Sequence, residues 1–306
     1  MRIAFFAGVT ALSTLLMSTA GLAQASCRQT TDHQTDLDAA VQQRIHAAMP
    51  GLLDHYQVPG AAVALVHNGA LGWSQGYGLA IPDQGIPVDP SSTLFQAASI
   101  SKSVTALTVL TLVQQGRVVL DQAIMPQLKE AAGSWQLPAS PDDRNAVTVA
   151  RVLSHTAGLT VPGYGGFPPG TPAQSLLASL KGAADADNAP LKVVEPPGQG
   201  FDYSGGGYSL LQLLIREQAE EPFAIAAAKR ILQALSMTNS RFPTTPAASP
   251  PLAATFDDQG ERAPARHFTA LAAAGLQTTA TDLAQLITLL MPGPCGEEPG
   301  RDVLQP

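Results

Sequence analysis

Two residues with chemistry of their own stand three positions apart in the stretch Ser99-Ile100-Ser101-Lys102. An apolar run from Ser99 to Gln115 surrounds them, so we expect a helix, in which side chains at positions i and i+3 share one face. An amine beside a serine hydroxyl can take its proton and make it a nucleophile. The helix N-terminus would add unpaired N–H donors for a developing oxyanion. Taken alone, the four residues fit a capping serine followed by a solvated lysine better than they fit a catalytic pair, because both residue types are common.

A second serine pattern competes with this one. The segment Gly72–Gly76 satisfies the G-x-S-x-G pattern of α/β-hydrolases, with Ser74 as its nucleophile. That pattern needs a strand, a sharp turn and then a helix. Here an Asn68-Gly69 turn signal comes before the motif and a proline-containing loop at 81–85 follows it. The context therefore disfavours Ser74.

The elements that must position the first pair begin with a hairpin. The apolar stretch 60–66 is separated from 71–74 by Asn68-Gly69, and this dipeptide tolerates the positive φ angles of a two-residue turn. Upstream, the composition of Thr35–Tyr56 predicts either one helix or a pair broken at Pro50-Gly51.

The middle of the chain has the composition and periodicity of helices, interrupted by loops rich in proline and glycine. Strands followed by a long helical stretch predict an α+β fold, in which an antiparallel β-sheet is flanked by helices and carries an inserted, mostly helical region. Besides the run at Ser99, the predicted helices are Val147–Ser154, Ser209–Glu220 and Pro222–Leu235.

The first 25 residues have the pattern of a secretory signal peptide. A single positive charge precedes an apolar run, and Ala23-Gln24-Ala25 provides the small residues of a cleavage site. We expect residues 26–306 to form one domain that is periplasmic or secreted, without a membrane span after cleavage; a membrane anchor is the alternative. The only cysteines, Cys27 and Cys295, could form a disulfide in that oxidising compartment.

Charge and motif content exclude several other classes. The net charge of -7 and the absence of a Lys/Arg run argue against a nucleic-acid partner. The six histidines include no H-E-x-x-H pair and the cysteines are not clustered, so we expect neither a metal nor another cofactor. With 45% hydrophobic residues in 306, the chain can bury a sizeable core.

Several segments, taken in order, resemble one family. The stretch from Pro87 to Lys102 looks like the nucleophile segment of class C β-lactamases, D-alanyl-D-alanine peptidases and related esterases, which belong to the β-lactamase and penicillin-binding-protein superfamily. The resemblance extends from about residue 37 to the end of the chain. Its further segments are Val58–Ala62, Val147–Leu159, Pro196–Ser204 and Ala273–Leu283.

The resemblance implies roles for three residues. Ser99 would attack the carbonyl of a small-molecule or peptide acyl substrate, Lys102 would assist as the base, and Tyr203 would carry the proton to the leaving group. Without the family context, Tyr203 would be an aromatic side chain packed beside a glycine-rich loop. His155 is implied to support the scaffold of the site rather than to act as a base.

Two departures from the family matter for specificity and activity. The second family motif is Tyr-x-Asn, and its amide binds the amide of the substrate, but Gly205 stands at the third position. This departure favours an esterase or a peptidase over an efficient β-lactamase.

The third family motif, Lys or His followed by x-Gly on a late strand, does not occur after Tyr203. We therefore expect the family's C-terminal strands to be missing, the hairpin to keep an unpaired edge, and the 306 residues alone to turn over substrate weakly or not at all. The leading interpretation is a serine hydrolase acting through acyl-Ser99 on an ester, peptide or lactam carbonyl. A non-catalytic exported remnant is the alternative.

Overall fold

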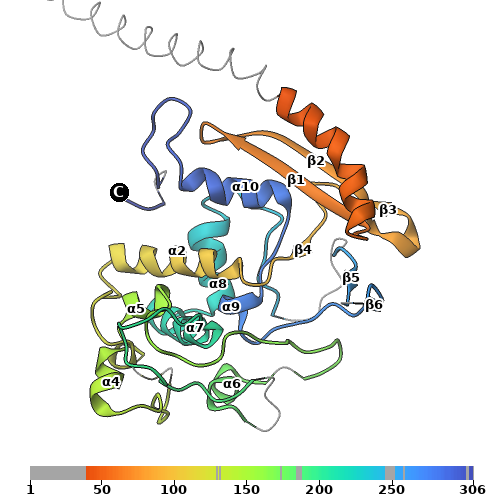
Figure 1. The fold of residues 1–306 in the computed structure, drawn as a ribbon. Coiled ribbons are helices and arrows are strands. Elements are labelled where there is room, and N and C mark those ends of the chain that lie inside the picture. Colours follow the sequence, from red (N-terminus) through yellow and green to blue (C-terminus); the bar gives the residue numbers. More distant parts are fainter. Residues whose placement is uncertain are drawn as a thin grey trace, which may run out of the picture.

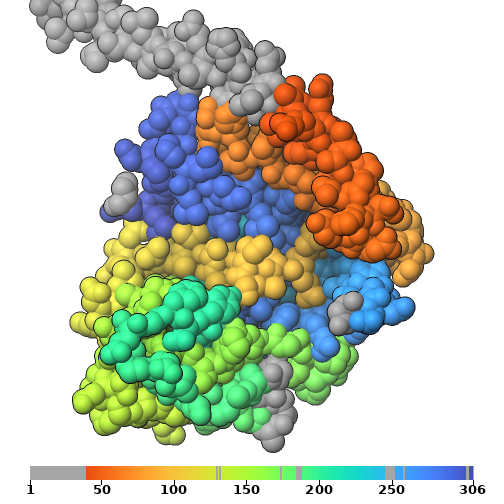
Figure 2. Space-filling model, viewed as in Figure 1, coloured from red at the N-terminus to blue at the C-terminus, as the bar shows by residue number. Residues whose placement is uncertain are grey.

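The structure is a computed structural model that describes residues 39–128, 130, 132–172, 174–183, 188–244, 252–257, 259–300 and 303–305. Figure 1 shows a β-hairpin with a helix on each side, above a larger body made of helices. The segment that contains α2 (Ser101–Gln114) runs as a yellow band between these two parts in Figure 2. The arrangement confirms the predicted α+β class.

The hairpin consists of β1 (Gly60–His67) and β2 (Ala70–Ile81), which pair antiparallel. Its turn is the predicted one: Asn68 and Gly69 have φ angles of 46° and 68°, as a two-residue hairpin turn requires. A short strand, β3 (Ile86–Pro87), pairs with the other edge of β2. Within the described residues the sheet order is β1-β2-β3, so β1 is an edge strand.

One helix over residues 39–55 lies along the hairpin, and it continues through Pro50 without a break. Of the two predicted possibilities, the single helix is therefore correct. The helix α10 (Ala280–Leu289) contacts both β1 and β2. No helix in the described part of the chain is long and apolar enough to span a membrane.

Two long helices form the centre of the molecule. The helix α2 packs against α7 (Gly205–Ala219), and both contact the short helix α9 (Leu271–Ala274). Nearly all side chains of α7 are buried. The fully buried side chains of the core include Leu112, Ile124, Leu128, Leu137, Leu180, Leu191, Leu210, Leu211, Leu213, Leu214 and Ile215.

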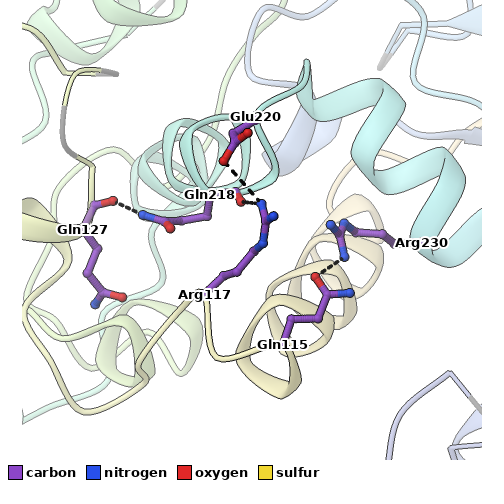
Figure 3. A network of polar contacts seen from close by, with 6 residues as sticks. All are labelled: Gln115, Arg117, Gln127, Gln218, Glu220 and Arg230. Carbon is purple, nitrogen blue, oxygen red and sulfur yellow. Dashed lines mark hydrogen bonds and ion pairs between the residues drawn. The ribbon is translucent and has the colours of Figure 1, made fainter.

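Polar contacts join the C-terminal ends of these two helices (Figure 3). Arg117 follows α2 and donates a 2.6 Å hydrogen bond to the carbonyl oxygen of Gln218, while its guanidinium lies 3.7 Å from the Glu220 carboxylate. Arg230 donates to the side chain of Gln115 at 2.9 Å. These contacts connect the C-terminal ends of α2 and α7 to each other.

Shorter elements connect and cover the centre. The strand β4 (Phe95–Gln96) pairs with β7 (Gln277–Thr278), and β5 (Thr255–Phe256) pairs with β6 (Arg262–Ala263). The other helical segments are η1 (Pro82–Gln84), α3 (Ile124–Gln127), α4 (Pro141–Ala146), α5 (Val149–Leu153), α6 (Leu176–Lys181), α8 (Phe223–Ala227) and the π-helical turn η2 (Ala228–Leu232).

One predicted helix boundary is wrong. The sequence predicts a helix from Ser209, whereas α7 already begins at Gly205. Three glycines in a row are poor helix formers, which hides this start. Ser204 determines where α7 begins, because its hydroxyl accepts a 2.9 Å hydrogen bond from the N–H of Gly207 and so caps the helix.

The proposed signal peptide, residues 1–25, lies outside the described residues. Cys295 is disulfide-bonded in the structure. The only other cysteine of the sequence, Cys27, also lies outside the described residues.

Candidate active site

The structure brings Ser99 and Lys102 into contact at the start of α2. Lys102 Nζ donates a hydrogen bond to Ser99 Oγ at 3.1 Å and another to the carbonyl oxygen of Ala273 at 2.9 Å. Ser99 is exposed, whereas Lys102 is 7% exposed. The residue before the serine, Ala98, has a φ of 44°, a conformation that alanine rarely adopts. A reachable hydroxyl is therefore held on a strained turn against a buried amine.

The start of α2 leaves fewer free N–H donors for an oxyanion than the sequence predicts. The N–H groups of residues 100–103 donate to the carbonyl oxygens of residues 97–100, so none of these four groups is free to bind an oxyanion. These four N–H groups are bonded because the turn that precedes α2 continues the hydrogen-bond ladder of the helix upstream. Among residues 99–103, all of which the structure describes, only the N–H of Ser99 makes no hydrogen bond. It is the one donor of this turn that could face an oxyanion.

A segment late in the chain, residues 272–276, packs against the start of α2 next to Ser99 and Lys102. Thr105 Oγ1 donates to the carbonyl oxygen of Ala272 at 2.9 Å, and the N–H of Leu276 donates to Ser101 Oγ at 2.9 Å. The side-chain oxygen of Gln212, on α7, accepts from the N–H of Ala272 at 2.9 Å. The sequence identifies Ala273–Leu283 only as a segment that resembles the family. Its contacts with α2 could not be predicted, because they use backbone atoms, which carry no residue-type signal.

Tyr203 lies on the other side of the amine, immediately before the Ser204 cap of α7. Lys102 Nζ is 4.9 Å from the centre of the Tyr203 ring, and the side chain is 40% exposed. Burial by itself raises the pKa of Tyr203, but hydrogen bonds with Lys102 and Ser99, and then the positive charge of Lys102, bring that pKa below its ordinary value. The three predicted residues thus share one set of interactions.

The space beside Gly205 is filled by the protein itself. A Cβ atom at this position would lie 3.1 Å from the carbonyl oxygen of Pro162 and 3.3 Å from the Cα of Gly163. Val161, which begins this loop, has a φ of 66°, which is unusual for a β-branched residue. A strained loop therefore occupies the place where a longer side chain at position 205 would begin.

The competing serine lies in a different environment. Ser74 is in the middle of β2, where it pairs with Ala64 of β1. The G-x-S-x-G pattern requires a turn at the serine and a helix after it, and a continuous strand provides neither. The structure thus excludes Ser74 as an α/β-hydrolase nucleophile.

Metal ligands do not gather in the part of the chain that is described. No group of three or more His, Cys, Asp or Glu side chains lies close enough to hold an ion there. The polar atoms of the site instead bond to one another, as Lys102 does with Ser99 and Ala273.

Comparison with known proteins gives consistent matches. The chain is 25% identical over 220 residues to "Protein flp" of Staphylococcus aureus (strain NCTC 8325 / PS 47), a match that covers 71% of this chain and 40% of that protein. It is 27% identical over 254 residues to a "Beta-lactamase" of Lysobacter lactamgenus, covering 82% of this chain and 60% of the relative. The chain thus spans 40% to 60% of the length of these relatives.

A solved structure supports the fold. The octameric penicillin-binding protein homologue from Pyrococcus abyssi matches with a TM-score of 0.66 and 24% identity, over 81% of this chain and 56% of that one. The family model described as Beta-lactamase matches residues 37–305, which include all of the site described above. The chain belongs to the Beta-lactamase family.

Proposed function

We propose that this chain carries the acylation site of a serine hydrolase, with Ser99 as the nucleophile and with Lys102 and Tyr203 as its proton-transfer pair. The observation that carries the proposal is the shared contact: the buried amine lies 3.1 Å from the nucleophile oxygen, and the same two groups lower the pKa of Tyr203. A lowered phenol pKa suits proton transfer near neutral pH better than an ordinary one does.

The chemistry follows from these positions. Ser99 Oγ forms a bond to the carbonyl carbon of the substrate, and its proton passes to the Lys102–Tyr203 pair. The pair returns the proton to the leaving oxygen or nitrogen while the bond between that atom and the carbonyl carbon breaks. Water then attacks the acyl-Ser99 ester and releases the acid.

An ester carbonyl is the substrate class that the site favours. The family's amide-binding asparagine is replaced by Gly205, and the backbone of Pro162 and Gly163 fills the space around it. A site without that hydrogen-bonding side chain loses discrimination for substrates that carry an amide. The relative from Lysobacter lactamgenus is named a beta-lactamase, so lactams are the competing class.

Export to the periplasm or the medium is part of the proposal. It is supported by the signal-like pattern of residues 1–25 and by the disulfide at Cys295, since disulfides persist in oxidising compartments. N-terminal sequencing of protein recovered outside the cytoplasm should begin at Ser26. Recovery with Met1 intact would contradict cleavage.

Covalent labelling tests the nucleophile. A fluorophosphonate probe should add to the 306-residue chain and to a Ser74→Ala control, as read by intact mass, and should not add to Ser99→Ala. The assignment fails if labelling survives Ser99→Ala. Absence of labelling in a folded wild-type chain would favour the alternative of a non-catalytic exported protein.

A further inference from the structure

His155 lies between the aromatic side chains that border the site. It follows α5 and has a φ of 58°, which turns the chain sharply there. Its ring centre is 4.4 Å from that of Tyr203 and 5.2 Å from that of Tyr208, with interplanar angles of 34° and 35°. Phe201 meets the same ring edge-on at 5.7 Å. The imidazole is thus packed between the proposed proton carrier and a buried tyrosine of α7.

The residues immediately before and after Tyr203 each donate a backbone hydrogen bond to His155. The N–H of Asp202 donates to the carbonyl oxygen of His155 at 2.8 Å. The N–H of Ser204 donates to His155 Nδ1 at 3.1 Å. Tyr203 stands between these two donors, so its backbone is fixed to His155 on both sides while its ring is stacked on the imidazole.

We propose that His155 is a positioning residue that directs the Tyr203 phenol toward Ser99 and Lys102, and that it does so only while Nδ1 is an unprotonated acceptor. This inference rests on the proposed function, because positioning matters only if Tyr203 transfers protons. An imidazole nitrogen that accepts a backbone N–H must carry a lone pair. Protonation turns Nδ1 into a donor that faces the Ser204 N–H, so the hydrogen bond is lost.

The charged and titratable groups that face the imidazole are Lys102 from α2, Tyr203 before α7, and Tyr208 within α7. Burial, and then the positive charge of Lys102, lower the pKa of His155. Burial, and then Tyr203, raise the pKa of Tyr208 to about 12, so Tyr208 stays a neutral phenol that donates to the carbonyl oxygen of Leu153 at 3.0 Å. At neutral pH the acceptor is therefore in place, and acid removes it.

Two variants separate the hydrogen bond from the ring. His155→Asn keeps a side-chain acceptor, tolerates a positive φ and does not titrate. His155→Phe keeps an aromatic ring and loses the acceptor. A matched control, His55→Asn, changes an exposed histidine of the 39–55 helix. Thermal unfolding followed by circular dichroism first establishes that each variant is folded.

The first measurement does not depend on activity. The phenol of Tyr203 is titrated by its ultraviolet absorbance, as the difference between each chain and the same chain with Tyr203→Phe. We expect His155→Phe to move the pKa of Tyr203 back toward its ordinary value, and His155→Asn to move it less. The proposal is overturned if the titration in His155→Phe is unchanged, or if the asparagine variant is as shifted as the phenylalanine variant.

The second measurement is the rate constant of fluorophosphonate labelling against pH. In the wild-type chain and the His55→Asn control the rate should fall in acid as His155 gains a proton. His155→Phe should label on the order of 10- to 100-fold more slowly at every pH, as misplaced catalytic groups do. The labelling rate of His155→Asn should fall by a smaller factor, and it should not decline further in acid. A decline in acid that persists in His155→Asn would overturn the proposal. If no chain labels but His155→Phe still shifts the Tyr203 titration, the positioning role stands and the hydrolase proposal fails.

Discussion

The amine of Lys102 donates a 2.9 Å hydrogen bond to the carbonyl oxygen of Ala273, 171 positions further along the chain. The same amine donates to Ser99 Oγ at 3.1 Å. A flexible lysine side chain is thus held at both sides of its nitrogen, once by the proposed nucleophile and once by a rigid backbone carbonyl. The geometry of a pair only three residues apart therefore depends on a helix from the far end of the chain.

Replacement of this amine should abolish most of the reactivity without unfolding the chain. Lys102→Met keeps a straight apolar chain of similar length in a buried position and removes the proton-transfer group. We expect fluorophosphonate labelling to slow on the order of 10²- to 10⁴-fold, the usual contribution of general acid–base catalysis. Lys192→Met, at an exposed position, is the control and should label at the wild-type rate. A Lys102→Met rate within twofold of wild type would remove the amine from the mechanism.

The phenol of Tyr203 should give the labelling rate its basic dependence on pH. Because hydrogen bonds and the charge of Lys102 outweigh burial and lower this pKa, the phenolate forms at a lower pH than in a free tyrosine. The rate should rise as pH passes through that pKa, and Tyr203→Phe should be slower and lack the rise. Tyr56→Phe, at a side chain that is 67% exposed, is the control. An unchanged rise in Tyr203→Phe would assign it to another group.

The lowered pKa of Tyr203 should also make the stability of the folded chain depend on pH. The folded chain releases the Tyr203 proton before the unfolded chain does, so between the two pKa values the unfolded state holds more protons and stability rises with pH. Urea unfolding of wild type and Tyr203→Phe at pH values up to 10 checks this: the difference in the free energy of unfolding should increase with pH in that window. A difference that decreases would contradict the direction of the shift.

A side chain at position 205 should destabilise the chain and should not create lactam hydrolysis. The Cβ of Gly205→Ala would press on Pro162 and Gly163, and such overpacking costs about 1–3 kcal/mol. Gly163→Ala is the matched control, because a Cβ there has no atom within 4 Å. Thermal unfolding compares the two variants. A stable Gly205→Asn chain that hydrolyses a chromogenic cephalosporin would show that the loop yields and that the missing amide alone sets specificity.

Asp282 should make stability depend on pH in acid. It is 4% exposed and accepts hydrogen bonds from Ser240 Oγ at 2.7 Å and from the N–H of Asn239 at 3.0 Å. Burial raises its pKa more than these bonds lower it, so the folded chain holds this proton to a higher pH than the unfolded chain. Stability should therefore fall as pH rises from the ordinary value of 3.8 through the folded pKa.

Asp282→Asn should remove that dependence, whereas Asp282→Ala should lose about 1–3 kcal/mol because Ser240 and Asn239 are left without their acceptor. Urea unfolding between pH 3.5 and 7 measures both, with the exposed Asp142→Asn as the control. A pH dependence of Asp282→Asn that matches wild type would show that another carboxyl is responsible.

Local sequence determined the elements whose signals lie within a few residues. Asn68-Gly69 specified the hairpin turn, because two positive φ angles are required there and these residues tolerate them. The apolar run after Ser99 specified α2, and the spacing of Ser99 and Lys102 specified that they meet. The order of the family segments then indicated Tyr203 as the third member.

Tertiary structure alone decided how the site is supported. The sequence does not reveal that Ala273 holds the amine or that a loop fills the space beside Gly205. For His155 the resemblance implies a supporting role, but only the structure shows that it accepts hydrogen bonds from the residues on both sides of Tyr203. These contacts join residues about 40 to 170 positions apart and use backbone atoms or ring stacking. Residue type and spacing encode short-range preferences, whereas such contacts exist only once the helices have packed.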